Sequence, residues 1–417
     1  MFPGKITGPG TLWHTGGSVN ATTAGGSLEL QGLNDFSGGL NLLSGAVIFN
    51  NAAAVGSGPI TFLNGAARLA ASANGIVITN HIDLSAVITN SFGLVNDFTL
   101  SGDVDLGSAG SDPQINVTNP ANTVTFIGSL TNTLGLVKAG AGKVVLTGNN
   151  TYGGPTTVLA GNLAINNTTG SGTSSGAVTV SPGSTLSGIG TIAGTVTVNG
   201  TVSPANSVGT LSTGGETWEG GGRYVWEMND AAGTAGSSPG WDRIAVNGTL
   251  QINANSGSKF TIDITSLSGT VGGNAANFNN SVAQEWTILT TTGGINSFDP
   301  TAFDLVTTSF SNSLGNANFV IKTSPSGNDL VLALFKPLSP TNLVTTAGGS
   351  ATFTGSPNTG YTVQYTDSLN PINWQTLTTV GVSGVVTTDG TGVGSFTDPD
   401  AANPTPPTER YFRIRYP

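Results

Sequence analysis

The 417-residue sequence contains no cysteine, only two histidines and few charged residues. Charged residues make up 8% of the chain, whereas an ordinary soluble domain carries about 25%. The absence of cysteine excludes disulfides, and it is compatible with secretion when the core is large enough. The net charge of −10 argues against a nucleic-acid partner, because phosphate contacts need clustered lysine and arginine.

Long apolar runs are also missing. No stretch of about 18 apolar residues occurs, so we expect no membrane-spanning helix. The first residues, MFPGKITGPG, lack the apolar core of a signal peptide. The sequence therefore gives no direct sign of an export route.

Glycine, threonine, serine and asparagine take the place of charge. The chain has 62 glycines and 37% hydrophobic residues, which is not the composition of a disordered chain. Glycine and proline interrupt the sequence too often for long helices. Alternating stretches such as GAVTVSPG, GTVTVNGTV and KFTIDITSL predict short strands between turns, and hence an all-β protein.

An internal repeat indicates the architecture. Residues 28–50 align without a gap with residues 144–166, VVLTGNNTYGGPTTVLAGNLAIN. The aligned positions share turn residues and apolar residues. The turn positions pair Gly32 with Gly148, Asn34 with Asn150, Phe36 with Tyr152, Gly38 with Gly154 and Gly45 with Gly161. Repeats of this length are typical of solenoids, in which stacked coils build a continuous core.

One repeat can be read as one coil. Val144 and Leu146 point to one side of a strand because side chains alternate with period 2. Glycine and asparagine then turn the chain, and Tyr152 can close the corner. The interval from Leu146 to Ile165 is a plausible length for one coil. We predict a β-solenoid over residues 1–215.

The composition changes after residue 215. Residues 216–335 contain four of the six tryptophans and longer strands, and we predict a β-rich region that caps the open end of the solenoid. Residues 336–342 read as a linker. Residues 343–417 predict a small immunoglobulin-like β-sandwich. In its last strand, RYFRIRY, we expect Phe412, Ile414 and Tyr416 on one face and Arg413 and Arg415 on the other.

The stretch LVKAGAGKVVLTGNNTYGGPTTVLAGNLAIN resembles the autotransporter-associated β-strand repeat. That repeat has a Lys-x-Gly-x-Gly lead, here Lys138, Gly140 and Gly142, and a Gly-Asn-Asn-Thr-Tyr turn, here 148–152. Pro155 departs from the pattern. The regions 216–335 and 343–417 resemble the C-terminal parts of secreted Verrucomicrobia-type repeat proteins. The resemblance implies an exported right-handed parallel β-helix with a surface or matrix role, and no catalytic residues.

Three short motifs resemble catalytic or phosphate-binding signatures. GAGK at 140–143 lacks the upstream glycine and the following serine or threonine of a phosphate loop. GSSPG around Ser238 lacks the strand and helix of a nucleophile elbow. SGSK at 256–259 has Ser-x-x-Lys spacing without its companion motifs. We interpret all three as loops or turns.

Paired acids are a further candidate. Asp103 and Asp105 lie about 7 Å apart on one strand face, which suits glycoside hydrolysis or Ca²⁺. Asp398 and Asp400 could likewise hold Ca²⁺. We favour an exposed acidic ladder for the first pair and an Asp-Pro turn for the second, so we expect no metal and no cofactor.

Aromatic and basic residues form two more candidates. Trp218, Tyr224, Trp226 and Trp241 lie close together in the sequence, as a sugar-binding platform or as a core. Arg410, Arg413 and Arg415 make the C-terminus basic. That end could meet an acidic flank of another copy, and a head-to-tail contact that does not close makes a filament. A charged, protected edge strand is the simpler interpretation.

The sequence as a whole favours a non-catalytic extracellular structural or adhesive surface protein, a stalk that self-associates head-to-tail into fibres. The alternative is a β-helix protein that binds or degrades polysaccharide. Charge geometry distinguishes them. An enzyme should bring three or more acids and a lysine or arginine to one groove, whereas a stalk should show threonine, serine and asparagine ladders.

Overall fold

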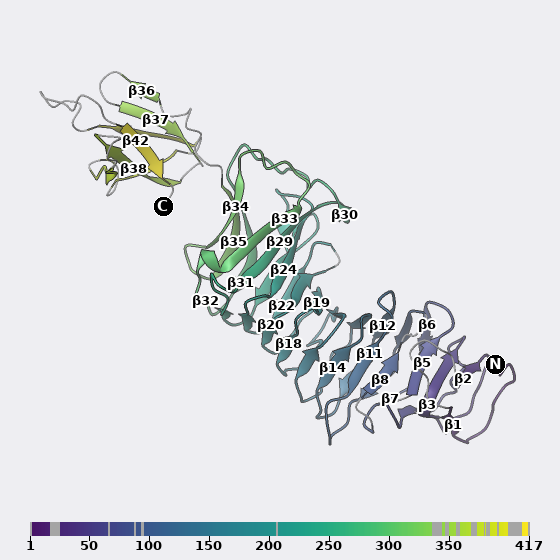
Figure 1. The fold of residues 1–417 in the computed structure, drawn as a ribbon. Helices are drawn as coiled ribbons and strands as arrows, with labels where there is room; N and C mark the ends of the chain where they lie inside the picture. Colours follow the sequence, from purple (N-terminus) through teal and green to yellow (C-terminus); the bar gives the residue numbers. More distant parts are fainter. Residues whose placement is uncertain are drawn as a thin grey trace, which may run out of the picture. The chain divides into compact units, whose positions relative to one another are not determined.

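A computed structural model gives the fold of the chain (Figure 1). It describes residues 2–16, 26–65, 67–86, 89–92, 96–205, 207–335, 344–346, 350–355, 359–367, 373–378, 380, 384–389, 392–398 and 411–415. Apart from one short 3-10 turn, η1 (Pro300–Ala302), the regular elements in these ranges are all strands. The chain forms two compact units. The first holds 1–277, 287–312 and 322–331, and the second holds 278–286, 313–321 and 332–417.

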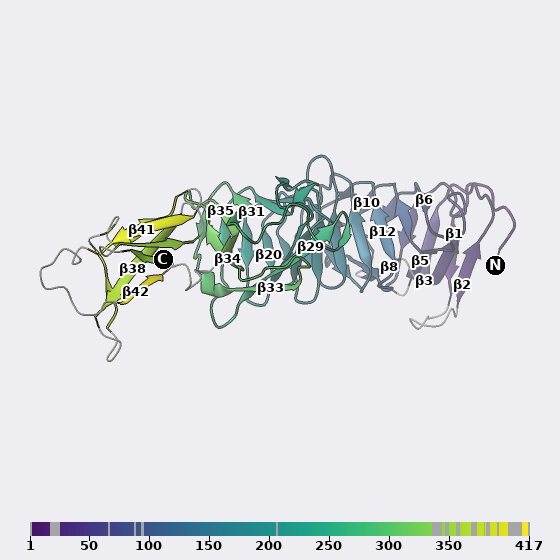
Figure 2. The same cartoon turned by 90° about the horizontal axis from the view of Figure 1, so that it is seen from above.

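The first unit is a parallel β-helix with three faces of stacked strands (Figures 1 and 2). The first face consists of β2 (Ser27–Leu30), β3 (Leu40–Phe49), β5 (Ala67–Ala71), β8 (Thr89–Phe92), β11 (Gln114–Val117), β14 (Leu136–Ala139), β16 (Thr156–Val158), β18 (Val178–Val180), β20 (Val196–Val198), β23 (Glu216–Trp218), β28 (Leu250–Ile252) and β32 (Ile295–Asn296). The second face consists of β6 (Ile76–Ile78), β9 (Phe98–Leu100), β12 (Thr123–Phe126), β15 (Lys143–Leu146), β17 (Asn162–Ile165), β19 (Thr185–Gly188), β21 (Thr201–Pro204), β24 (Arg223–Met228), β29 (Phe260–Ser268) and β33 (Phe303–Ser309).

The third face begins with β1 and the first half of β3 and is completed by shorter strands. Its members are β1 (Leu12–Thr15), β4 (Ile60–Phe62), β7 (Ile82–Asp83), β10 (Val104–Asp105), β13 (Leu130–Thr131), β22 (Thr210–Thr213), β27 (Arg243–Val246) and β31 (Gln284–Thr291). Between β13 and β22 the face continues through backbone hydrogen bonds, such as Asn150 N–H to Ser171 C=O at 2.9 Å and Gly172 N–H to Thr191 C=O at 2.8 Å. Three short strands lie in loops: β25 (Thr234–Ala235), β26 (Gly240–Trp241) and β30 (Val271–Gly272).

The predicted coil length is confirmed in both copies of the repeat. Leu146 is the register partner of Ile165, and Leu30 is the register partner of Phe49, so the chain returns to the same position after the interval that the sequence predicts. Val144 stacks on Leu163, which stacks on Leu186, and all three are at most 1% exposed. Period-2 alternation thus fills the interior with stacked apolar side chains. The right-handed sense stays a prediction.

The coils become wider after residue 215. Tyr224 is the register partner of Ile262, and Ile262 is that of Leu305, so these coils are much longer than those of the repeat. The extra residues form loops that carry β25, β26 and β30. Parallel pairing therefore crosses the predicted boundary at 215/216, as between Val196 and Glu216, and the domain boundaries stay predictions.

Glycines at one corner allow consecutive coils to approach closely. A Cβ on Gly176 would lie against the carbonyl oxygen of Gly154, and one on Gly194 against that of Gly176. Neither glycine has a positive φ, so the reason for glycine here is close backbone approach. By contrast, Gly161 at φ 68° and its repeat partner Gly45 at φ 77° occupy the left-handed region that favours glycine.

The second unit contains most of β34 (Asn318–Thr323), most of β35 (Asp329–Phe335) and two small antiparallel sheets. One sheet is formed by β36 (Val344–Thr346), β37 (Ser350–Thr354) and β41 (Val393–Thr397). The other is formed by β38 (Gly360–Thr366), β39 (Gln375–Thr376), β40 (Val385–Thr387) and β42 (Tyr411–Arg415). Phe353, Tyr361, Val363 and Phe396 share a buried core. The immunoglobulin-like topology stays a prediction, and the linker 336–342 lies outside the described residues.

Candidate functional site

A lysine lies inside the solenoid. Lys138 in β14 takes an inward position between Ile115 and Val158, and it is 0% exposed. Its Nζ donates hydrogen bonds to the carbonyl oxygens of Ala139, Gly140 and Ala160 at 2.8–2.9 Å. Burial lowers the pKa of Lys138 to about 8. The sequence placed Lys138 in the repeat lead without a role. Here it binds corner carbonyls of two successive coils.

Buried asparagines connect the coils in the same way. Asn150 accepts a hydrogen bond from Leu130 N–H at 2.8 Å and donates to Gly172 C=O at 2.5 Å. Asn34, its partner in the repeat alignment, accepts from Ile6 N–H at 2.8 Å and donates to Ala54 C=O at 2.6 Å. One side chain therefore joins three consecutive coils. Tyr152, which was expected to close the corner, is fully buried and bonds Thr156 Oγ1 at 2.5 Å.

Glu216 places a carboxyl group in the interior where the wide coils begin. It is 2% exposed, and it accepts hydrogen bonds from Thr213 Oγ1 at 3.0 Å and Trp218 Nε1 at 2.7 Å. Burial raises the pKa of Glu216 to about 7, against the smaller opposing effect of the two hydrogen bonds. The side chain is enclosed by protein, and its carboxyl group faces Thr213 and Trp218 in the interior.

Asp242 is a second interior acid, and it joins the segment before β22 to strand β24. It is 0% exposed, and it accepts hydrogen bonds from Gly209 N–H at 2.8 Å and Glu227 N–H at 3.1 Å. Burial raises the pKa of Asp242, and the nearby Glu227 carboxylate adds to that rise. Burial also raises the pKa of Glu227 to about 7. Sequence reasoning missed these acids. A signal exists only for Glu216, which alternates with Trp218 on the buried face of ETW.

The aromatic group belongs mainly to the core. Trp218, Tyr224 and Trp226 are each 0% exposed. Trp218 stacks on Phe260 with ring centroids 4.3 Å apart, and Trp226 Nε1 donates to Asp242 C=O at 2.9 Å. Trp241 is half-buried. These rings are therefore not an exposed sugar platform.

The acids Asp103 and Asp105 accept hydrogen bonds from their own coil and from the next one. Asp103 Oδ1 accepts from Ser129 N–H at 2.9 Å. Asp105 Oδ1 accepts from Gly107 N–H at 2.7 Å and Asn132 Nδ2 at 2.8 Å. Asp105 is the register partner of Asp83, so the two acids extend one ladder. In the described part of the chain, no group of three or more histidine, aspartate or glutamate residues could hold a metal ion.

The three short motifs lie in turns. Gly140 has φ 73° and Lys143 begins β15. Ser238 Oγ accepts a hydrogen bond from Asn229 Nδ2 at 2.9 Å in the loop between β25 and β26. Lys259 forms an ion pair with Asp304 at 2.8 Å. Among the described residues, Ser238 forms no hydrogen bond to a histidine or a carboxylate that could activate it.

One depression of about 420 Å³ lies on the second face. Its lining includes Lys143, Asn166, Ser187, Ile189, Val208 and Thr270. Burial lowers the pKa of Lys143. Ser187 Oγ donates to Asn162 Oδ1 at 2.8 Å. The lining has one cation, amide and hydroxyl groups and no carboxylate, so it lacks the paired acids of glycoside hydrolysis.

The basic C-terminal strand follows the predicted alternation. Phe412 and Ile414 pack against the core of the second unit, and Arg415 is exposed. Arg410, Tyr416 and Asp400 lie outside the described residues. Asp398 is 9% exposed, which does not fit an open Ca²⁺ site.

Residues 136–165 match the family model described as the passenger-associated-transport-repeat. The matched stretch contains β14, β15, β16 and β17, together with Lys138, Asn150 and Tyr152. The resemblance to an autotransporter-associated β-repeat is thereby confirmed for this part of the chain. A search of the curated proteins finds no match to the chain. In the described ranges, no helix is long and apolar enough to cross a membrane.

Proposed function

We propose that the chain is a non-catalytic extracellular structural or adhesive protein whose β-helix serves as a stalk on a cell surface or in a matrix. The observation that carries this proposal is a threonine ladder on the first face. Thr157, Thr179, Thr197 and Thr217 stack outward on four consecutive coils. Such ladders fit a stalk, because a stalk has a mechanical role that rests on continuous backbone pairing between its coils.

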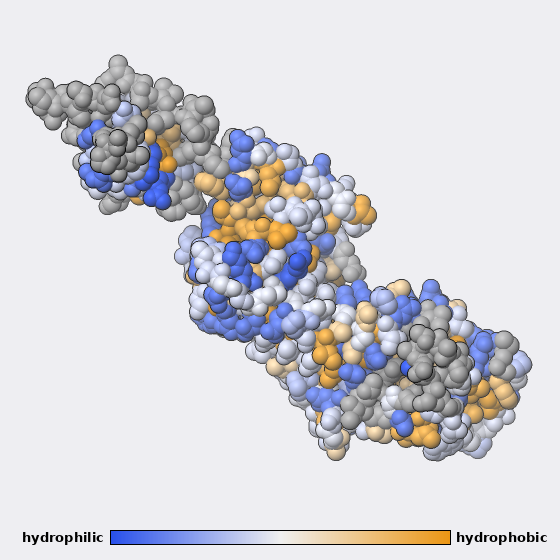
Figure 3. Space-filling view, viewed as in Figure 1, coloured by the Kyte–Doolittle hydropathy of each residue, from blue (hydrophilic) through white to orange (hydrophobic). Residues whose placement is uncertain are grey.

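The chemistry of the described surface also supports a mechanical role. The depression on the second face has no carboxylate in its lining, and the interior acids Glu216 and Asp242 are sealed by protein. Apolar residues gather in separate patches among hydrophilic ones (Figure 3). The passenger-type repeat at 136–165 supports export and a surface location.

Assembly into fibres is the second part of the proposal. Parallel pairing along the stack can in principle continue from one copy to the next by strand addition, and a contact that does not close makes a filament. Negative-stain electron microscopy of the purified chain tests this. Regular filaments are expected. Dispersed rods at high concentration would contradict assembly into fibres but would still agree with a stalk.

Catalysis is tested separately. The purified chain is incubated with a panel of acidic polysaccharides, and release of unsaturated sugars is followed by their ultraviolet absorbance. We expect no release above a buffer control. Release that scales with protein concentration would overturn the non-catalytic assignment.

A further inference from the structure

One sheet face of the second unit carries a preorganised arginine. On β42, Arg413 is the register partner of Gln364 on β38, which is the partner of Thr376 on β39. These three side chains therefore lie side by side across three strands. Their neighbours Phe412 and Ile414 pack into the core, so the row faces away from it.

The guanidinium of Arg413 is held in place by two contacts. Its Nε donates to Gln364 Oε1 at 2.8 Å, and its Cζ lies 4.5 Å from the centroid of the Trp374 ring. Gln364 is held in turn by a 3.5 Å contact from its Nε2 to Thr376 Oγ1. Stacking and one hydrogen bond fix the plane of the guanidinium, and less side-chain entropy is then lost on binding.

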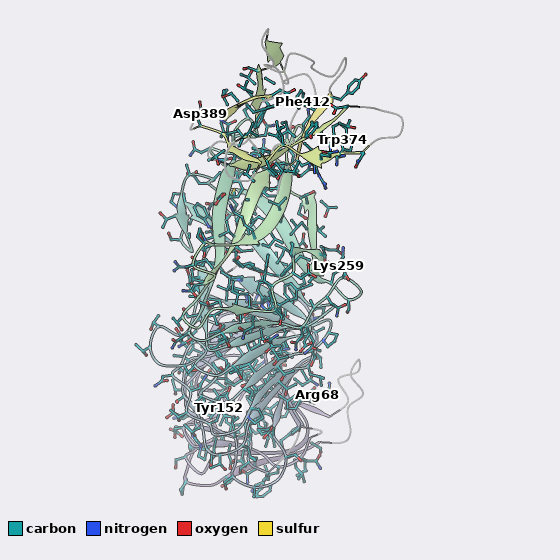
Figure 4. All side chains as sticks on the ribbon, turned by 90° about the vertical axis from the view of Figure 1, so that its left-hand side faces the viewer. Arg68, Tyr152, Lys259, Trp374, Asp389 and Phe412 are labelled. Carbon is teal, nitrogen blue, oxygen red and sulfur yellow. The ribbon has the colours of Figure 1, made fainter. Side chains whose placement is uncertain are left out.

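The Nη atoms of Arg413 form no hydrogen bond to another of the described residues, so their N–H groups can serve a ligand. A planar guanidinium matches a carboxylate through two parallel N–H···O bonds. Arg415 stands further along the same strand face, roughly 7 Å away, so two successive carboxylates can be met. Figure 4 shows Asp389, an acid of this unit, on the opposite side from Trp374.

We propose that this face, formed by Gln364, Trp374, Thr376, Arg413 and Arg415, binds a polysaccharide that contains uronic acid residues. The two arginines bind the sugar carboxylates, Gln364 and Thr376 bind hydroxyl groups, and Trp374 packs against the apolar C–H face of a sugar ring. This binding activity goes beyond the stalk role and does not depend on it.

A uronate polymer fits these residues better than a nucleic acid does. Two arginines supply few phosphate contacts, and tight DNA binding uses about 6–10 of them. A uronate offers a carboxylate, hydroxyls and an apolar ring face in one unit, which matches the arginine, amide and tryptophan side chains on this sheet. Charge attraction should weaken as salt is raised.

Native electrophoresis of the full chain in gels containing polygalacturonate tests the binding face, with dextran gels as the neutral comparison. The unmodified protein should be retarded by polygalacturonate and not by dextran. Arg413→Gln should abolish the retardation. Arg413→Lys keeps the charge but loses the two parallel N–H donors and the stacking on Trp374. It should raise the apparent Kd about tenfold.

Matched controls lie in the first unit. Arg223→Lys repeats the same chemical change at an arginine paired with Asp263, and it should leave retardation unchanged. Trp13→Ala removes a 56% exposed tryptophan and should also have no effect, whereas Trp374→Ala should weaken retardation. Thermal unfolding of each variant checks that the second unit is folded.

Three results would overturn the binding face. The first is equal retardation of the unmodified protein and Arg413→Gln. The second is equal retardation by double-stranded DNA, which would make the face a general anion-binding surface. The third is self-association that Arg413→Gln abolishes in sedimentation velocity, with no polygalacturonate binding, which would make the face a contact between copies. None of these results would affect the test of the stalk, which depends on the rods or filaments seen by electron microscopy.

Discussion

At the scale of single residues, a few buried polar side chains connect neighbouring coils. Asn150 bridges Leu130 and Gly172, and Lys138 binds carbonyls of two coils. Each occupies a position where the adjacent coil would otherwise leave a buried N–H or C=O without a partner. Such groups are costly when unsatisfied, so these residues matter more than their number indicates.

Replacing Asn150 with alanine should destabilise the first unit by about 2–4 kcal/mol, since Leu130 N–H and Gly172 C=O both lose their partner. Urea unfolding followed by circular dichroism measures the change. Asn149→Ala is the matched control, because Asn149 is exposed and accepts one hydrogen bond, from Ser171 N–H at 3.1 Å. Equal destabilisation by both variants would contradict a bridging role for Asn150.

The stability of the solenoid should depend on pH through Glu216. Burial raises its pKa from 4.5 to about 7. Well below pH 4.5 the Glu216 carboxyl is protonated in both the folded and the unfolded chain, so it does not lower the free energy of unfolding. As pH rises the unfolded chain ionises first, so stability falls until the folded group ionises near pH 7. The full loss is about 3 kcal/mol.

The variant Glu216→Gln should remove that loss, because it carries no charge. Its amide oxygen can accept from Trp218 Nε1, and its amide nitrogen can donate to Thr213 Oγ1. Urea unfolding at pH 5, 6, 7 and 8 measures the dependence. Part of the slope should remain, because the pKa of Glu227 is raised to about 7 by burial as well. Glu219→Gln, at a half-buried position, is the control. An unchanged slope in Glu216→Gln would rule out Glu216 as the source.

At the scale of elements, the close approach of coils depends on stacked glycines. Gly154, Gly176 and Gly194 follow one another at the same corner. A side chain there would push the backbones of successive coils apart, and parallel pairing on both flanking strands would be strained.

We expect Gly176→Ala to destabilise the first unit by about 1–3 kcal/mol through overpacking. Gly10→Ala serves as the control, since a Cβ there has no atom within 4 Å and should change stability by less than about 0.5 kcal/mol. Thermal unfolding compares the two. Similar melting temperatures for the two variants would contradict the overpacking, because they would mean that the backbone at this corner can move to accommodate the Cβ of Gly176→Ala.

At the scale of the whole molecule, each of the two units has buried apolar residues of its own. Leu163 stacks between Val144 and Leu186 in the first, and Phe353 packs with Tyr361 in the second, with ring centroids 5.5 Å apart. We therefore expect two transitions in calorimetry. Leu163→Ala should lower the free energy of unfolding of the first unit by about 2–5 kcal/mol. Phe353→Ala should lower that of the second unit by about 3–5 kcal/mol. A shift of both transitions by either variant would indicate one cooperative unit.

The candidate sites were only partly predictable from the sequence. The acids Asp103 and Asp105 and the alternation of Phe412, Arg413 and Ile414 followed from period 2. The burial of Lys138, Glu216 and Asp242 did not, because a charged residue in a strand pattern is expected on the outer face. Their hydrogen-bond partners meet them only in the folded chain, as Ala160 meets Lys138 and Gly209 meets Asp242. Short-range patterns do not contain that information.

The sequence by itself determined the parallel β-helix and the length of its repeated coil. Alternation of side chains and the left-handed preference of Gly45 and Gly161 are local properties of the chain, and the repeat carries them twice. Only the tertiary structure decided how long the later coils are and which aromatics are buried. Tyr224 is the register partner of Ile262, and not of a residue at the distance of one repeat. The register of each coil is set by the strand on which it stacks.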